Sequence, residues 1–201
     1  MLAIVDYGVG NLFSLKSSLS AIGVESALIA NPEELKNADR IILPGVGAFG
    51  DAAKKLRETG LFDAVLQEAA AGKPILGICL GMQLLLEKSY EFGEHDGLGL
   101  IEGEVKPISD VIPAGYKIPH IGWNELDFGT HPLFKGLIEG DCVYFVHSFY
   151  GAKCPNVIAT TDYGAELTAA VAKDNVMGCQ FHPEKSGAVG LKILRNFCDL
   201  N

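Results

Sequence analysis

The chain has 201 residues, of which 48% are hydrophobic and 20% are charged, and its formal net charge is −9. These values are typical of one folded domain with a substantial core, so we expect residues 1–201 to form a single domain. The acidic balance and the lack of any lysine and arginine cluster argue against a nucleic-acid surface, and no apolar stretch predicts a membrane segment or a signal peptide.

The cysteines and histidines do not have the spacing of a metal site. The five cysteines are scattered and form no Cys-x-x-Cys pair, which is typical of a protein of the reducing cytoplasm. The five histidines form no local cluster, and no Gly-Lys-Ser/Thr phosphate loop is present. We therefore expect no metal and no cofactor, although a metal site assembled only by folding stays open at this point.

Strand and helix patterns alternate through the first half of the chain. Strands are predicted at 2–5, 24–30, 40–43 and 75–78, and helices at 12–22, from 32 onward, at 51–71 with a break at Gly60, and at 80–88. The second half has a glycine-rich loop at 93–103, then strands at 103–108, 122–128, 142–149, 157–161, 167–173 and 176–181, and a helix at 188–200. This order predicts an α/β fold, in which helices cover a central, mostly parallel sheet and antiparallel strands are added along one side.

Two asparagines are expected to cap helices. Asn31 stands before Pro32 and two glutamates, which is a common helix start. Asn11 follows the turn Gly8-Val9-Gly10, where a dinucleotide-binding loop would need a third glycine in place of Phe13. A tight turn with Asn11 as the cap of the next helix is therefore the better interpretation.

The stretch Gly77-Ile78-Cys79-Leu80-Gly81 places a cysteine where a strand turns into a helix. Such a nucleophile elbow strains the backbone at Cys79, and close packing of strand and helix requires the glycines on either side, Gly77 and Gly81. The amides at the helix start favour a thiolate and could hold an oxyanion. The plain alternative, a buried cysteine that acts as a small hydrophobic residue, fits the elbow alone equally well.

A histidine and a carboxylate follow the last predicted strand, in Phe181-His182-Pro183-Glu184. Pro183 is expected to keep this segment extended, so that Glu184 lies on the same side as His182, orients its ring and stabilises its charge. A lone His-Pro often marks only a turn. Together with the elbow, however, this segment predicts a triad in which His182 takes the proton of Cys79.

The chain resembles the class I (triad) glutamine amidotransferases over essentially its whole length, in Gly-Ile-Cys-Leu-Gly-Met-Gln and in Phe-His-Pro-Glu-Lys-Ser. More narrowly, four segments resemble the glutaminase subunits of imidazole glycerol phosphate synthase, of histidine biosynthesis: 6–11, 43–50, 119–124 and 144–148. The resemblance implies a flavodoxin-like fold, glutamine as the substrate, and a (β/α)8-barrel cyclase subunit that receives the ammonia in a 1:1 heterodimer.

The segment Leu43-Pro44-Gly45-Val46-Gly47 follows a strand and fits a flexible turn, but its glycines also let backbone amides approach a reacting atom closely. The resemblance implies an oxyanion hole formed by the amides of Gly47 and Leu80, with Val46 as the peptide that flips. Such a flip would regulate the glutaminase.

Further roles come from the resemblance alone. It implies that glutamine is contacted by Gln83, His147, Ser148 and Phe149, whereas the pattern alone places Gln83 on a helix surface and Phe149 in the core. It also implies a partner surface formed by Trp123, Lys185 and His120. From the pattern alone, a single tryptophan is more often core, and His120 belongs with His95 and His131 as loop histidines.

Three alternatives remain open from the sequence. The first is a glutaminase of another pathway, such as the anthranilate or pyridoxal phosphate route, with the same triad and a different partner. The second is a free-standing cysteine peptidase or deglycase of similar fold, and the third is a binding module without catalysis. The complete triad disfavours the third, and the segment Pro119–Asn124 disfavours the first.

Overall fold

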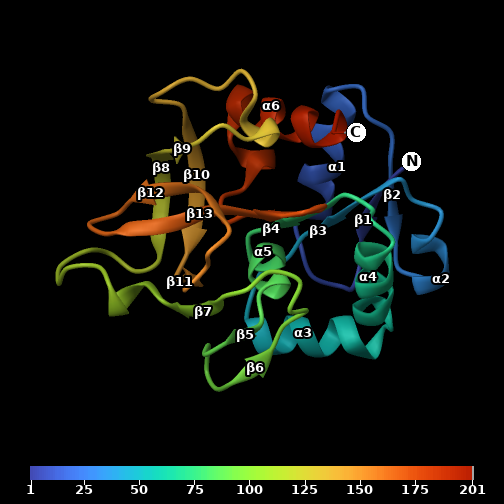
Figure 1. The fold of residues 1–201 in the computed structure, drawn as a ribbon, viewed down its shortest axis with the longest axis horizontal. Coiled ribbons are helices and arrows are strands. Elements are labelled where there is room, and N and C mark those ends of the chain that lie inside the picture. Colours follow the sequence, from blue (N-terminus) through green and yellow to red (C-terminus); the bar gives the residue numbers. More distant parts are fainter. Residues whose placement is uncertain (201) are drawn as a thin grey trace.

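The computed structural model of the protein describes residues 1–200, and its main feature is an eight-stranded sheet with the order β2-β1-β3-β4-β14-β13-β12-β9 (Figure 1). The strands of this sheet are β1 Leu2–Val5, β2 Ser26–Ile29, β3 Arg40–Leu43, β4 Ile75–Ile78, β9 Asp127–Phe128, β12 Val157–Asp162, β13 Glu166–Lys173 and β14 Val176–Cys179. The first five strands of the order run parallel, and β13, β12 and β9 are antiparallel additions at one side. The predicted α/β fold is thus confirmed, and the parallel part begins with the flavodoxin-like strand order.

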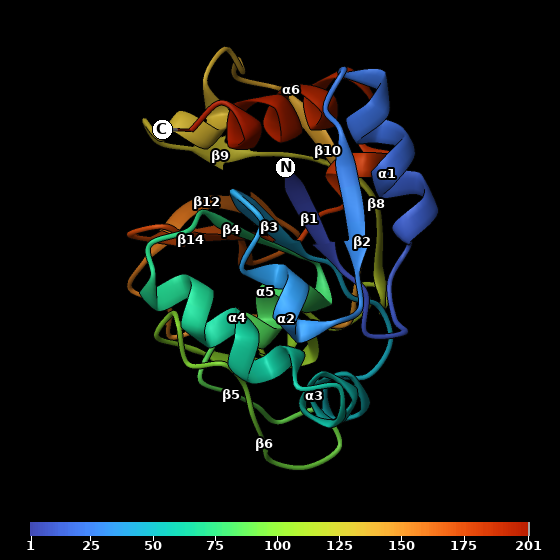
Figure 2. The same ribbon diagram turned by 90° about the vertical axis from the view of Figure 1, so that its right-hand side faces the viewer.

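Helices cover both faces of the parallel strands. They are α1 Leu12–Ala21, α2 Pro32–Leu35, α3 Phe49–Glu58, α4 Leu61–Ala70, α5 Leu80–Leu85 and α6 Gly187–Cys198. Figure 2 shows α1 and α6 on one side of the sheet and the other helices on the opposite side. Within residues 1–200, no helix has the length and apolarity that crossing a membrane requires.

Alternation along the strands explains why two hydrophobic clusters form. Successive side chains of a strand point to opposite faces, so Ala3 and Val5 pack in the cluster with α3, α4 and α5. Leu2 and Ile4 pack on the other face, in the cluster with α1 and α6. A strand buried on both faces is apolar throughout, which is the pattern that predicted these strands.

The two expected helix caps have different outcomes. The Asn31 side chain accepts a hydrogen bond from the Glu33 amide at 3.1 Å, as predicted. The Asn11 side chain makes no cap hydrogen bond, so that prediction was wrong. Asn11 has φ −89° and ψ 65°, outside the extended region that lets a cap side chain reach the first amides of the helix.

Two long strands predicted in the second half are each divided between two sheets. The segment expected at 122–128 is β8 His120–Glu125, which pairs with β10 Cys142–His147, followed by β9 of the main sheet. The segment expected at 142–149 ends β10 at His147 and continues as β11 Phe149–Ala152 in a smaller sheet. Apolar alternation reports which side chains are buried but not which strand is the neighbour, so the sequence could not show these changes.

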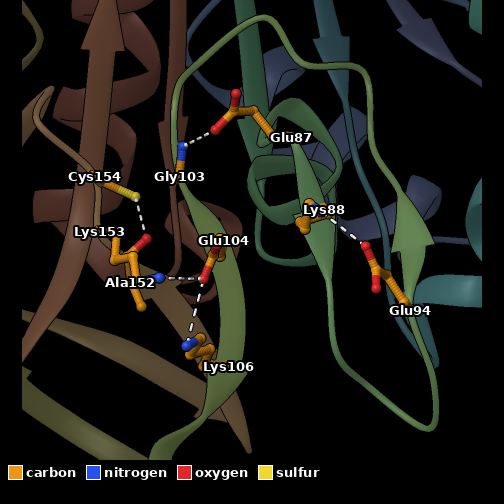
Figure 3. Close-up of polar contacts among 9 residues, drawn as sticks. All are labelled: Glu87, Lys88, Glu94, Gly103, Glu104, Lys106, Ala152, Lys153 and Cys154. Carbon is orange, nitrogen blue, oxygen red and sulfur yellow. Dashed lines mark hydrogen bonds and ion pairs between the residues drawn. The ribbon is translucent and has the colours of Figure 1, made fainter.

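The smaller sheet has the order β11-β7-β5-β6, with β5 Lys88–Ser89, β6 His95–Asp96 and β7 Glu104–Pro107. An ion pair of 2.7 Å between Lys88 and Glu94 closes the loop between β5 and β6 (Figure 3). On β7, Glu104 pairs with Lys106 at 3.4 Å and with Lys153 at 3.2 Å. The predicted loop at 93–103 therefore contains a short strand, and Glu91, between β5 and β6, contacts the Phe49 amide at the start of α3.

The remaining ordered turns are the 3₁₀ helices Ile108–Asp110, Pro132–Phe134 and Pro183–Lys185. Because β1, β3, β4 and β14 are parallel, their carboxyl ends meet at one edge of the sheet. The segments after these strands carry Tyr7, Val46, Cys79 and His182. This is the edge where α/β proteins of this type bind their ligands.

Candidate active site

Cys79 stands on the strained elbow that the sequence predicted. Its φ of 55° and ψ of −112° lie outside the regions that most residues adopt. A Cβ on Gly77 would lie 2.7 Å from the backbone of Gly81, and a Cβ on Gly81 would overlap the carbonyl of Leu43. Both glycines are thus required for α5 to pack directly onto β3 and β4, which confirms the reason given for them.

His182 and Glu184 form a buried pair next to the nucleophile. The His182 Nδ1 atom lies 2.8 Å from Glu184 Oε1, and both side chains are about 3% exposed. The segment is not extended as predicted, because Pro183–Lys185 forms a 3₁₀ turn. The proline angle near −65° suits that turn as well as an extended chain, and the turn itself brings the carboxylate back to the ring.

The charge of His182 is set by its two neighbours. Burial lowers the pKa of the imidazole, but interactions with the Cys79 sulfur and the Glu184 carboxylate outweigh burial and raise this pKa to about 9. Because a carboxylate only accepts hydrogen bonds, Nδ1 carries a proton and Nε2 is the atom left to exchange a proton with Cys79. His182 can therefore hold a proton at neutral pH.

A cavity of about 510 Å³ opens in front of Cys79. Nine residues predicted for the site or its partner surface line it: Val46, Gly47, Cys79, Leu80, Gln83, Ser148, Phe149, His182 and Lys185. Four residues for which the sequence predicted no role of their own also line it: Glu91, Phe92, Pro119 and Val146. The cavity is large enough for an amino acid the size of glutamine. Among the described residues, no three metal-ligating side chains come together.

The loop after β3 is held at its base and open at its tip. The buried Tyr7 hydroxyl donates to the Pro44 carbonyl at 2.8 Å. A Cβ on Gly45 would lie 2.8 Å from that hydroxyl, whereas a Cβ on Gly47, at φ 93°, would meet nothing within 4 Å. A peptide rotation in this loop is therefore confined to Val46 and Gly47, because Gly45 is fixed by close packing.

Gln83 is buried and not on a helix surface. Its Nε2 donates to the Phe149 carbonyl at 3.2 Å and to Gln180 Oε1 at 2.9 Å, which uses both of its N–H groups. Its Oε1 accepts no hydrogen bond from residues 1–200 that meets normal geometry, and the side chain lines the cavity. Any polar contact of Gln83 with a ligand is thus made by an acceptor oxygen.

His147 does not line the cavity, and His120 does not lie in an exposed loop or surface. His147 is buried behind the cavity, and its Nδ1 donates to the Phe149 carbonyl at 2.8 Å. His120 is 1% exposed, stacks on Tyr163 with 3.9 Å between ring centroids, and has its Nδ1 3.0 Å from His147 Nε2. His120 is therefore neither a loop histidine nor part of an exposed surface. Its burial depends on residues from other strands, which the local pattern does not report.

This buried histidine pair predicts a pH dependence of folding. Burial lowers the pKa of His147 from 6.5 to about 4, opposed by its hydrogen bond to Phe149 and reinforced by the nearby His120 and His182. Between pH 6.5 and 4 the unfolded chain binds a proton that the folded chain does not. We expect the contribution of His147 to the free energy of unfolding to be complete above pH 6.5. The free energy of unfolding should fall by up to about 3 kcal/mol as the pH drops from 6.5 to 4.

The measurement is urea unfolding at several pH values for the wild type and for His147→Asn. Asparagine keeps an N–H donor near the position of Nδ1 but does not titrate. The variant should show a flatter dependence of the unfolding free energy on pH between 4.5 and 6.5. Equal slopes in the two proteins would contradict a neutral, buried His147.

The other two residues of the expected partner surface, Trp123 and Lys185, are exposed. Trp123 is 55% exposed and lies edge-on to Tyr144, with 6.1 Å between ring centroids. Lys185 places its Nζ 5.9 Å from the centre of the Tyr144 ring and lines the cavity. These three side chains form one surface cluster directly beside the candidate active site.

Glu91 is the main residue of the cavity that no sequence motif indicated. It is 8% exposed, and its Oε2 accepts from the Phe49 amide at 2.6 Å. Burial raises the pKa of Glu91, although the amide hydrogen bond opposes this. The residue belongs to the loop between β5 and β6, so the pairing of the small sheet, not a local motif, brings it to Cys79.

The family model for class I glutamine amidotransferases matches residues 3–200. The chain belongs to this family. The imidazole glycerol phosphate synthase subunit HisH of Sulfurimonas denitrificans is 53% identical to this amidotransferase over 201 residues, which cover 98% of this chain and 97% of the relative. The HisH subunit of Wolinella succinogenes is 50% identical over 204 residues and all of both chains.

A solved structure supports the fold of this amidotransferase independently. The crystal structure of a glutamine amidotransferase aligns with a TM-score of 0.77 over 98% of this chain and 97% of that one, at 22% identity. Sequence identity this low shows the fold alone. The predicted family and fold class are both confirmed.

Proposed function

We propose that this amidotransferase is the glutaminase subunit of imidazole glycerol phosphate synthase and hydrolyses glutamine to glutamate and ammonia in the cytoplasm. One observation supports the chemistry most: Cys79 on its elbow and His182 line a single cavity, and the buried Glu184 carboxylate lies 2.8 Å from His182 Nδ1. Identity of about 50% to HisH subunits over the full length supports the pathway, histidine biosynthesis.

In the first half of the proposed reaction, the Cys79 thiolate attacks the side-chain amide carbon of glutamine. The amides of Leu80 and Gly47 stabilise the negative charge that develops on the amide oxygen. His182 gives its proton to the leaving nitrogen, the C–N bond breaks, and ammonia departs. A glutamyl thioester on Cys79 remains, and Glu184 keeps the His182 ring oriented throughout.

The second half releases glutamate. Neutral His182 takes a proton from a water molecule as its oxygen attacks the thioester carbonyl carbon. The C–S bond then breaks, which restores the Cys79 thiolate beside protonated His182. One glutamine and one water have become one glutamate, one ammonia and one proton, which the new carboxylic acid releases to water, and no cofactor is consumed.

The lining of the cavity suggests how glutamine is oriented. The buried Glu91 carboxylate lines the same cavity as Cys79 and can form an ion pair with the α-ammonium group of glutamine. Gln83 Oε1 can accept a further hydrogen bond from that ammonium group. We assign the α-carboxylate to the backbone and hydroxyl at Ser148 and Phe149, which line the same cavity. The amide end of glutamine would then reach the nucleophile.

Ammonia released into water would be protonated and lose its nucleophilicity, so a partner has to receive it directly. We propose a 1:1 complex with a (β/α)8-barrel cyclase subunit, which uses the ammonia to form imidazole glycerol phosphate and aminoimidazole carboxamide ribonucleotide. The cluster of exposed Trp123, half-buried Tyr144 and exposed Lys185, of which Lys185 lines the cavity, is the surface we assign to this partner. Aromatic residues are favoured at such interfaces.

The experiment is to measure glutamine hydrolysis by the subunit alone and after mixing with the cyclase subunit and its ribonucleotide substrate. We expect slow hydrolysis alone and an increase of about two to three orders of magnitude in the complex, the size of one missing oxyanion donor. Full activity without a partner would support the rival cysteine hydrolase. Activation only by the synthase of another pathway would contradict the assignment to histidine biosynthesis.

Val46→Gly tests whether the loop after β3 carries this regulation. Val46 is β-branched and resists left-handed backbone angles, whereas Gly47 already adopts φ 93° in open space. Replacement by glycine should raise the hydrolysis rate of the isolated subunit and reduce the activation by the cyclase. A variant whose basal rate and activation both match the wild type would contradict a loop that switches between two peptide orientations.

A further inference from the structure

Gln180 is a fully buried polar residue in contact with the nucleophile. It follows β14 directly, and its side chain is 0% exposed. Its backbone amide donates to the Ala169 carbonyl at 2.8 Å, which fixes it at the end of the sheet. Its side-chain amide lies between Gln83 and Cys79, 2.9 Å from Gln83 Nε2 and 3.7 Å from the Cys79 sulfur. No role in the triad or the oxyanion hole accounts for this placement.

The orientation of the Gln180 amide follows from a backbone carbonyl. The Phe149 oxygen can only accept, so the Gln83 atom 3.2 Å from it has to be Nε2. The second hydrogen of Gln83 Nε2 then points at Gln180, whose facing atom has to be the acceptor Oε1. The other end of the Gln180 amide, which faces the Cys79 sulfur, is therefore Nε2, a donor.

We propose that Gln180 is a further catalytic residue of the glutaminase reaction, whose side-chain N–H stabilises the Cys79 thiolate while its carbonyl fixes Gln83. A hydrogen bond to the charged form of a group favours that form, and a donor beside sulfur supports the thiolate but not the thiol. No proton is transferred to or from Gln180 in any step. The inference rests on the proposed function for its link to glutamine but not for its effect on the sulfur.

The chain Cys79, Gln180, Gln83 and the Phe149 carbonyl also joins the nucleophile to the substrate side of the cavity. Gln83 has no free N–H group, so its acceptor Oε1 faces the cavity only while Gln180 Oε1 and the Phe149 oxygen hold its amide. Loss of Gln180 would let the Gln83 amide rotate. The expected effects are thus a weaker nucleophile and a weaker hold on glutamine, both from one side chain.

Two variants separate these effects. Gln180→Glu keeps the shape and an acceptor for Gln83 but places a second negative group, with no donor, against the sulfur. Gln180→Leu removes both contacts at similar volume. It replaces Gln180→Glu as the test variant if the buried carboxylate of the glutamate prevents folding. Thr161→Val is the matched control, because it removes a buried hydroxyl that donates to the Glu125 carbonyl at 2.7 Å, far from Cys79 in the fold.

The readout is the rate at which iodoacetamide alkylates Cys79 in the full-length chain as a function of pH, with the modified cysteine identified by peptide mass spectrometry. The pH of half-maximal rate should move upward by about one unit in both Gln180 variants and stay unchanged in Thr161→Val. The same unshifted midpoint in Gln180→Glu and Gln180→Leu would overturn the assignment.

Steady-state hydrolysis of glutamine in the complex with the cyclase completes the test. Gln180→Glu should lower kcat more than it raises KM, because it keeps the acceptor for Gln83, whereas Gln180→Leu should change both by about tenfold. Alkylation needs neither glutamine nor the partner. A shifted midpoint without any glutamine hydrolysis by the wild type would therefore reject the proposed function and leave the contact with sulfur supported.

Discussion

Cys79→Ala is expected to abolish glutamine-dependent synthesis by the complex with the cyclase, by about 10⁴-fold or more, while synthesis from added ammonia stays intact. The sulfur is placed to form the covalent bond, since the elbow presents it to the cavity that His182 also lines. Ammonia enters the cyclase reaction after the glutaminase step, so its use does not depend on Cys79. The measurement is the rate of product formation with each nitrogen source.

Cys179→Ala provides the matched control for this prediction. Cys179 is also buried, one residue before Gln180, but burial raises the pKa of its thiol well above the ordinary value, with smaller contributions from Glu184 and Cys79. It stays a thiol and packs in the core, so its replacement should change the rates with glutamine and ammonia alike, and only modestly. Retained glutamine use in Cys79→Ala would contradict a thioester mechanism altogether.

The parts of the site that the sequence could predict are those whose chemistry is local. At the elbow, the glycines two positions from Cys79 are required by contacts within one turn of chain, so the motif alone carries the geometry. His182 and Glu184 are likewise two residues apart. They pair as predicted, although the backbone between them forms a 3₁₀ turn and not the predicted extended segment. Short-range spacing therefore predicted the nucleophile, the base and its orienting carboxylate.

The parts that could not be predicted depend on which distant segments become neighbours. Glu91 reaches the cavity because β5 pairs with β6 and β7, and His120 is buried because Tyr163 and Phe145 stack on it. Gln180 stands two residues before His182, yet only the folded arrangement shows its amide between Gln83 and the sulfur. A local pattern reports periodicity and turns. Neither of these features depends on the long-range contacts, so the sequence could not predict them.

His182→Ala should be the second most damaging change, because one residue acts as the acid for the leaving ammonia and as the base for water. General acid–base catalysis of this kind contributes about 10² to 10⁴-fold, and we expect a loss of at least that size in glutamine-dependent turnover. Glu184→Gln keeps the shape of the side chain but removes the charge that stabilises protonated His182. Glu184→Gln should therefore lower glutamine-dependent turnover measurably, but less than His182→Ala does.

The pH profile distinguishes the role of Glu184 from simple packing. In the wild type the pKa of His182 is about 9, against the effect of burial, because of the Cys79 sulfur and the Glu184 carboxylate. Removal of the carboxylate charge lowers that pKa, so the alkaline limb of kcat/KM, which reports loss of the His182 proton, should move to lower pH in Glu184→Gln. A variant with reduced turnover but an unmoved alkaline limb would leave Glu184 with a packing role only. Thioester formation that survives both His182→Ala and Glu184→Gln would assign the proton transfer to other residues.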